Sequence, residues 1–128
     1  MDLILDTHVI LWMLLNDLRL KPKQIELLED PANRFYVSAV SAFEIATKVR
    51  IGKLPEAMEI SRDFRRICTD FDYRELEITH AHGLRGGEID GTHRDPFDRL
   101  LAAQSLVEGY PLMTNDRLFK EFGVETVW

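Results

Sequence analysis

Short apolar runs alternate with helix-length segments along the chain, and this alternation is the feature that most limits the possible folds. Between the runs, apolar residues recur at helical spacing, as in 8–17 and in 22–30 before Pro31. Strands alternating with helices of this length favour an α/β domain with a mainly parallel sheet between helical layers. The expected strands are 3–5 (LIL), 34–38 (RFYVS), 75–78 (ELEI), 111–114 (PLMT) and 124–128 (VETVW).

Three further helices are predicted from caps and spacing. Ser38 or Ser41 can cap a helix that ends at Gly52. Apolar residues at helical spacing over 60–71 predict one amphipathic helix with arginines on its other side. A short helix is expected over 116–122, between the last two strands.

The segment 84–94 (LRGGEIDGTHR) contains three glycines and no periodicity, which predicts a mobile loop. A helix follows it and ends near Gly109. Asp95 is placed as its N-cap with Pro96 at the first helical position, and Asp98 falls in the first turn. Two aspartates therefore stand where one would be enough to cap the helix.

Composition indicates one domain over residues 1–128, because this length with 45% hydrophobic residues can bury a sizeable core. The only cysteine, Cys68, excludes an internal disulfide and thiolate metal clusters. No apolar run approaches the ~18 residues of a membrane span, and the N-terminal segment carries Asp2 and Asp6 where a signal peptide would be basic. We therefore expect a cytoplasmic protein without membrane contact. The net charge of −6 argues against broad, non-specific adhesion to nucleic acid.

Four acidic residues are predicted to meet at one edge of the sheet. Asp6 and Asp116 follow predicted strands, and parallel strands end at the same edge. Glu44 lies in the first turns of a helix that follows a strand, so it belongs to that edge as well. Asp98 joins them only if the glycine-containing loop returns the chain to this edge.

Such a group of carboxylates requires neutralisation. At about 5 Å, each pair repels by roughly 3 kcal/mol at an effective dielectric constant near 20. All pairs together would offset the folding stability of a small domain. Protonation or a bound cation can relieve the repulsion, and an all-oxygen site suits Mg²⁺ or Mn²⁺. A metal ion held there could assist the attack of water on a phosphodiester.

Each of these acids also has a simpler explanation. Asp98 in the first turn would interact favourably with the helix dipole. Glu44 and Lys48 are four residues apart, which suits an exposed ion pair. Asp116 could form a turn or cap the short helix that follows it. Asp6 has the fewest alternatives, because it directly follows a buried strand and has no cationic neighbour in sequence.

Four sequence blocks carry a family resemblance: LILDTHVILWML, SAVSAFEIATKVRIGKL, HRDPFDRLLAAQSLVEGYPLMTND and VETVW. Together they resemble PIN-domain proteins of the VapC toxin type, in the right order and over nearly the whole chain. The resemblance implies a three-layer α/β/α fold and a divalent-metal-dependent ribonuclease of a type II toxin–antitoxin system. It also implies a cognate antitoxin partner and favours a homodimer.

By matching motif, the acidic quartet of the family falls on Asp6, Glu44, Asp98 and Asp116. The resemblance implies that Asp6 and Asp98 bind Mg²⁺ (or Mn²⁺) directly, while the other two act through water or a second ion. RNA would then be cut by a metal-activated water, leaving a 5′-phosphate by analogy with related metal nucleases. The resemblance further suggests three supporting residues, Asp95, Thr7 and Thr114, although either threonine could instead satisfy a backbone group at a strand end.

Further surfaces are candidates for RNA or protein contact. His93, Arg94 and Arg99 are candidates for phosphate contact, with solvation as the alternative, and the other three histidines receive no role. The apolar excess of helix 8–17 suggests an antitoxin groove or a dimer contact, with burial in the core as the alternative. The arginines of 60–71 could meet RNA or an acidic partner, or face solvent.

Two other classes of protein do not fit this pattern, and one alternative remains. A phosphatase with an aspartyl nucleophile would have a second aspartate two residues after Asp6, where this chain has His8. A receiver domain would pair adjacent acids after the first strand and place a lysine late in the chain, and neither arrangement is evident. A PIN module that binds metal but acts through protein contacts is the remaining alternative to an enzyme.

Overall fold

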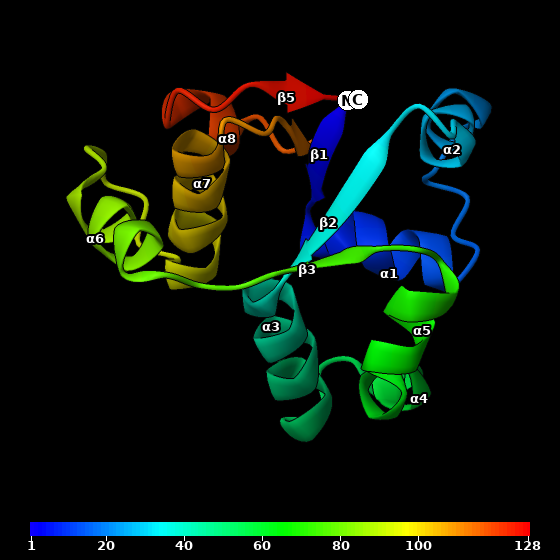
Figure 1. The fold of residues 1–128 in the computed structure, drawn as a ribbon. Coiled ribbons are helices and arrows are strands. Elements are labelled where there is room, and N and C mark those ends of the chain that lie inside the picture. Colours follow the sequence, from blue (N-terminus) through cyan, green and yellow to red (C-terminus); the bar gives the residue numbers. More distant parts are fainter.

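A computed structural model describes all residues from 1 to 128 and shows a five-stranded, all-parallel sheet (Figure 1). The strand order across the sheet is β3-β2-β1-β4-β5. β1 is central, with Ile4 beside Tyr36 of β2 on one side and Leu112 of β4 on the other. The strands are β1 (Asp2–Leu5), β2 (Arg34–Ser38), β3 (Arg74–Leu76), β4 (Leu112–Met113) and β5 (Thr126–Val127).

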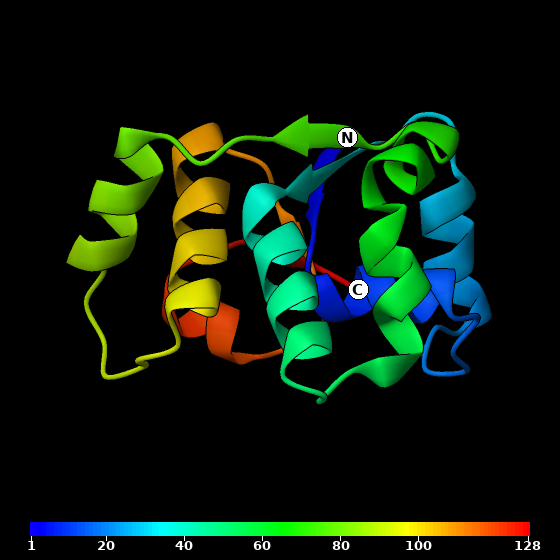
Figure 2. The same cartoon turned by 90° about the horizontal axis from the view of Figure 1, so that it is seen from below.

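Helices cover both faces of the sheet, which gives the expected three-layer α/β/α arrangement (Figures 1 and 2). α1, α2 and α5 pack on one face, and α7 and α8 on the other, with α6 against the outside of α7. α3 follows β2 directly. The helices are α1 (Thr7–Leu14), α2 (Pro22–Glu29), α3 (Ala39–Arg50), α4 (Met58–Arg62), α5 (Phe64–Asp70), α6 (His80–Glu88), α7 (Pro96–Glu108) and α8 (Leu118–Glu121), with a 3₁₀ turn at Pro55–Ala57.

Two apolar clusters fill the space between these layers. Alternate residues of β1 point to opposite faces, so Leu3 and Leu5 join the first cluster while Ile4 joins the second. The first cluster includes Val9 and Ile10 of α1. The apolar excess of that helix is therefore largely taken up by the core, the alternative that the sequence left open. None of the helices could span a lipid bilayer, because each is too short or too polar.

Two predicted boundaries agree closely with the structure. The Ser38 hydroxyl accepts a hydrogen bond from Val40 N at the start of α3, and the positive φ of Gly52 (78°) follows the end of that helix. Asp95 Oδ1 accepts from Phe97 N and caps α7, which ends at the left-handed Gly109. Both helices are placed by local signals that need no tertiary information.

The loop predicted over 84–94 is wrong for its first half, because α6 extends to Glu88. Thr79 and His82 form a capping box at its start, and Gly86 faces α7. A Cβ on Gly86 would lie 3.4 Å from the carbonyl oxygen of Arg99 and 3.6 Å from Ala103 Cβ. These are ordinary van der Waals distances, so Gly86 lies in a helix that packs on α7 and does not mark a loop.

The single amphipathic helix predicted over 60–71 is also wrong. The chain breaks at Asp63 (φ −105°, ψ 19°) into α4 and α5. The two short helices can then pack separately, since Ile60 contacts α3 while Cys68 contacts the main core. The first helix ends at Leu14, earlier than predicted, and Asn16 follows with a positive φ of 52°.

Candidate active site

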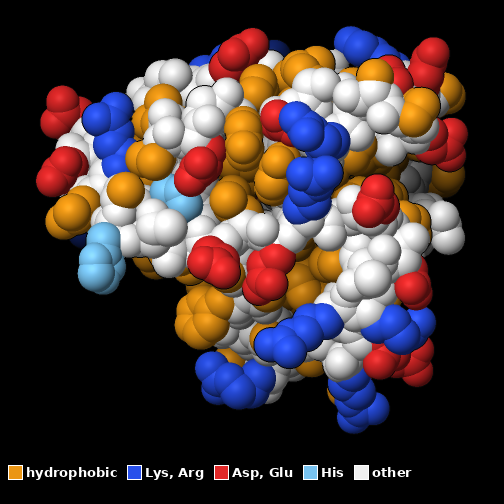
Figure 3. Space-filling model, viewed as in Figure 1, with side chains coloured by type: hydrophobic (Ala, Val, Ile, Leu, Met, Phe, Trp, Pro, Cys, Tyr) orange, Lys and Arg blue, Asp and Glu red, His pale blue; other side chains and the backbone are white.

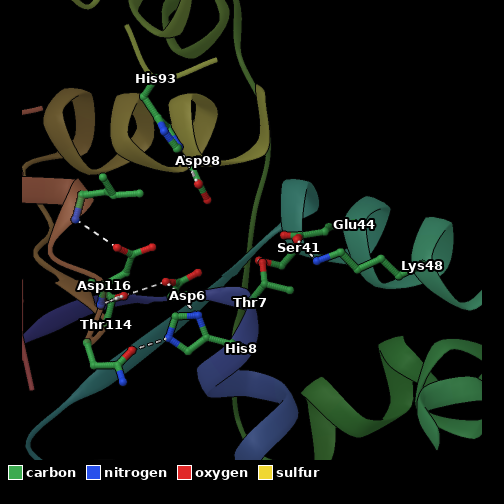
Figure 4. Close-up of polar contacts among 12 residues, drawn as sticks. Asp6, Thr7, His8, Ser41, Glu44, Lys48, His93, Asp98, Thr114 and Asp116 are labelled. Carbon is green, nitrogen blue, oxygen red and sulfur yellow. Dashed lines mark hydrogen bonds and ion pairs between the residues drawn. The ribbon is translucent and has the colours of Figure 1, made fainter. Parts of the chain in front are cut away.

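Asp6 stands at the carboxyl end of the central strand and is 4% exposed. Its backbone N–H donates to Met113 O of β4, which fixes the residue to the sheet. Its side chain does not cap α1 and instead accepts a hydrogen bond at Oδ2 from the Thr114 hydroxyl, at 2.6 Å (Figure 4). Burial raises the pKa of this carboxyl group to about 6, and the Asp98 charge acts in the same direction.

His8, which sequence reasoning left without a role, lies beside this carboxylate. Its Nδ1 is 3.2 Å from Asp6 Oδ2, and its Nε2 is 3.0 Å from Asn115 Oδ1. The ring therefore bridges the start of α1 and the segment after β4 (Figure 4). The sequence signal is weak, because a histidine two residues after Asp6 acquires its partner Asn115 only when β1 and β4 pair.

Asp98 approaches the same region from the first turn of α7, and its side chain is 23% exposed. His93 Nε2 lies 2.8 Å from its Oδ2. Burial raises the pKa of Asp98, the hydrogen bond from His93 opposes that rise, and the charges of Asp95 and Asp116 add to it. The pKa of Asp98 is thus raised by an acid of its own helix cap, Asp95, and by one after β4, Asp116.

Arg99 holds the segment that precedes α7. Its Nε donates to Gly86 O at 2.9 Å, its Nη1 to His93 O at 3.0 Å, and its Nη2 to Ile89 O. These contacts use three of the five N–H donors of the guanidinium, so the phosphate contact expected of Arg99 stays a prediction that would use the other two. Arg94 remains exposed, and its side chain forms no hydrogen bond or ion pair within the chain.

Glu44 and Asp116 lie at the borders of the same space, and each makes the local contact that was its simpler explanation. Lys48 Nζ donates to Glu44 Oε2 at 2.7 Å, so this carboxylate is turned along α3 (Figure 4). Asp116 Oδ1 accepts from Leu118 N at 3.0 Å, while its own N–H donates to Thr114 Oγ1. Each contact involves only one of the two carboxylate oxygens.

Buried hydroxyl and amide groups join the elements around the carboxylates. The hydroxyls of Thr7 and Ser41 lie 2.9 Å apart and connect the starts of α1 and α3. Ser38 Oγ donates to Gln104 Oε1 at 2.5 Å, and the amide nitrogen of Gln104 donates to Glu77 O. The sequence reading did not identify Ser41 or Gln104 as positioning residues, although both lie in the blocks that carried the family resemblance.

The four predicted carboxylates thus come from four separate elements around the carboxyl edge of the sheet. In Figure 4, Asp6, Asp98 and Asp116 face one space from different sides, and Glu44 borders it beyond Thr7 and Ser41. No three His, Cys, Asp or Glu side chains lie close enough together to hold a metal ion. The donor set nevertheless fits a hard divalent cation, because both polar side-chain contacts of the buried Asp6 fall on Oδ2 and leave Oδ1 available.

The family model described as "PIN domain" matches residues 3–125. A comparison with curated proteins finds no match.

Solved structures with the same fold include three complexes at low sequence identity. VapBC2 from Rickettsia felis, bound to a promoter DNA fragment, has a TM-score of 0.74 at 19% identity and covers 99% of this chain and 98% of that chain. DNA-bound VapBC from Salmonella typhimurium has a TM-score of 0.71 at 16% identity and covers 99% and 97%. FitAcB from Neisseria gonorrhoeae has a TM-score of 0.70 at 21% identity and covers 98% and 96%. At these identities the likeness concerns the fold.

Proposed function

The chain belongs to the PIN domain family, and from this membership we propose that it is a divalent-metal-dependent endoribonuclease, the toxin of a type II toxin–antitoxin system. The observation that carries the proposal is the Asp6 carboxylate, which is buried at the end of the central strand with its pKa raised to about 6. A buried acid with a raised pKa that faces another acid is typical of a functional site. Residues 1–128 would form one catalytic domain.

The residues fall into three roles in this proposal. Asp6 and Asp98 would bind Mg²⁺ or Mn²⁺ directly, while Glu44 and Asp116 would complete the site through water or a second ion. The bound ion would lower the pKa of a water molecule and stabilise charge on the phosphate oxygens. Asp95 caps the helix that carries Asp98, and its charge adds to the negative field there.

Two hydroxyl groups would support this arrangement differently. Thr114 donates to Asp6 Oδ2 and so orients the carboxylate that would bind the ion. Thr7 bonds Ser41 and so fixes the start of α1 against α3. His93, Arg94 and Arg99 would contact RNA phosphates at the entrance. His93 would then exchange its contact with Asp98 for one with substrate.

One observation favours the second candidate, a PIN module that binds metal and acts through protein contacts. The Glu44 carboxylate, one of the four acids that the enzyme would use, is already paired with Lys48. The enzyme remains the better supported proposal, because Asp6 and Asp98 both have raised pKa values and neither is neutralised by a lysine or arginine.

A cognate antitoxin is the proposed protein partner, and a homodimer is the proposed assembly. The structural neighbours support the first part, since their names describe two-component VapBC and FitAcB assemblies. RNA is the proposed substrate.

The test combines cleavage with metal binding. The purified chain should cut labelled RNA only when Mg²⁺ or Mn²⁺ is present, and Asp6→Asn or Asp98→Asn should lower the rate on the order of a thousandfold. Asp70→Asn is the matched control, because Asp70 is an exposed acid on α5. Metal binding by the wild type without cleavage would favour the binding module, and full cleavage by Asp6→Asn would contradict both candidates.

A further inference from the structure

A second concave surface lies between α3 and the pair α4–α5, and we call it the arginine groove. Its volume is about 820 Å³. Figure 3 looks onto this face and shows hydrophobic atoms between groups of basic side chains. Its basic members are Arg62, Arg65, Arg66 and Arg74.

The arginine groove carries positive charge that the chain does not compensate. Arg62, Arg65 and Arg74 are exposed, and none of them forms an ion pair or a side-chain hydrogen bond, whereas Arg66 pairs with Asp63 and Asp70. The chain as a whole has a net charge of −6, so this surface is opposite in sign to the molecule around it. Local charge of this kind favours an acidic partner.

The floor of the arginine groove is apolar. It is formed by residues that include Val37, Ala42, Phe64, Cys68 and Tyr73. Such a floor favours a ligand that brings aliphatic or aromatic side chains together with its charges. An extended peptide can do so on alternate residues.

One wall of the groove belongs to an open sheet edge. Arg74 and Glu75 line the groove and lie in β3, which pairs only with β2. The outer edge of β3 therefore has backbone groups free to pair with an added strand. This edge favours an extended segment as the ligand.

The arginine groove is separated from the acidic site by α3. Ala39, Ala42 and Ala46 of that helix line the groove, whereas Ser41 and Glu44 face the carboxylates (Figure 4). Together with the apolar floor and the open edge of β3, this separation from the acidic site favours a peptide over RNA as the occupant.

We propose that the arginine groove binds an extended acidic segment of a partner protein. Acidic side chains of that segment would pair with Arg62, Arg65 and Arg74, and its apolar side chains would cover the floor. The inference rests on the proposed partner of this chain and specifies the surface and chemistry of that contact. A ligand held there would pack on the face of α3 opposite Glu44.

The test uses the full chain and three labelled probes in fluorescence anisotropy. The probes are a short peptide in which Asp or Glu alternates with aliphatic residues, the same peptide with Asn and Gln in place of the acids, and a single-stranded RNA. The acidic peptide should bind at least about tenfold more tightly than the amide peptide, with an affinity that falls as salt rises. The variant Arg62→Glu, Arg65→Glu, Arg74→Glu should lose this binding by a similar factor.

Matched variants separate this result from a change in net charge or in folding. Lys23→Glu, Lys53→Glu, Lys120→Glu makes the same change in charge at exposed positions outside the groove and should bind the acidic peptide as the wild type does. If the arginine variant does not fold by circular dichroism, Arg74→Gln alone should still weaken binding.

Three results would overturn the inference: no binding of the acidic peptide, equal binding by the arginine variant and the wild type, or loss of RNA affinity alone in that variant. RNA cleavage is measured separately on the same proteins without peptide. A wild-type chain that binds the peptide but cuts no RNA would reject the proposed nuclease and retain the groove.

Discussion

The two halves of the candidate site are built in different ways. Asp6 and Thr114 follow adjacent strands of the sheet and are both buried. Asp98 and His93 belong to the start of α7 and the segment before it, and both are partly exposed. One half is fixed by the register of the sheet, and the other by side chains that hold a loop.

The strand half therefore contains a buried charge, whereas the loop half is held in place by hydrogen bonds. Burial raises the pKa of Asp6 to about 6, so the strand half carries the larger desolvation penalty. The loop half depends on Arg99, whose guanidinium joins α6, the loop and α7 through three backbone carbonyl groups. We therefore expect the strand half to determine how stability varies with pH, and the loop half to determine local order.

The largest expected effect concerns Asp6 and pH. Because its pKa is about 6 in the folded chain and 3.8 when unperturbed, the folded state binds more protons between these values. The free energy of unfolding, measured with urea in the presence of a chelator, should fall by up to about 3 kcal/mol as pH rises from about 4 to 6. Asp6→Asn should remove most of this slope and be more stable than the wild type at pH 7.

Two comparisons test whether Asp6 is the source of that slope. Asp98→Asn should change it less, because the Asp98 side chain is only partly buried. Mg²⁺ or Mn²⁺ at pH 7 should raise the unfolding temperature of the wild type and leave that of Asp6→Asn unchanged. A wild-type stability that rises between pH 4 and 6 would show that the burial of Asp6 does not dominate.

Arg99→Gln should produce the next largest effect, in the loop half. The substitution removes a charged donor from three carbonyl groups, and we expect a loss of about 2 kcal/mol in the free energy of unfolding. Amide hydrogen exchange should accelerate over 89–94 before it does in the sheet. Arg94→Gln is the control, since Arg94 is exposed and unpaired, and equal stability of both variants would show that Arg99 does not hold the loop.

The same division explains which features could be predicted from the sequence. Asp6 and Asp116 were assigned to one edge because strand ends in a parallel sheet meet there, and β1 and β4 do pair in parallel. Asp95 was recognised as a cap from its place before Pro96. These signals are local or follow from topology alone. The contact of Glu44 with Lys48 was equally readable, from a spacing of four residues.

The features that were missed depend on contacts between distant segments. His8 is positioned by a hydrogen bond with Asn115, 107 residues away in the sequence, and Gln104 by one from Ser38, 66 residues away. Gly86 is predicted to lie in a loop, because sequence composition does not distinguish a glycine in a loop from one inside a helix. The contacts of Arg99 with three carbonyl groups are also absent from the sequence prediction, since these partners come together only after the loop has folded.

The smallest expected effect concerns Thr114. Its substitution tests how far the Thr114 hydroxyl orients the Asp6 carboxylate, apart from the effect of burial. Thr114→Val keeps the shape of the side chain but removes the hydroxyl that donates to Asp6 Oδ2. The affinity for Mn²⁺, measured by calorimetry, should then fall about tenfold, or about 1.4 kcal/mol. Thr69→Val is the matched control, because it makes the same chemical change at a hydroxyl that donates to Arg65 O on α5 and contacts no acid. Thr114→Ser should restore the affinity. If Thr114→Val binds Mn²⁺ as well as the wild type does, the sheet alone orients Asp6 and the hydroxyl has no part in the site.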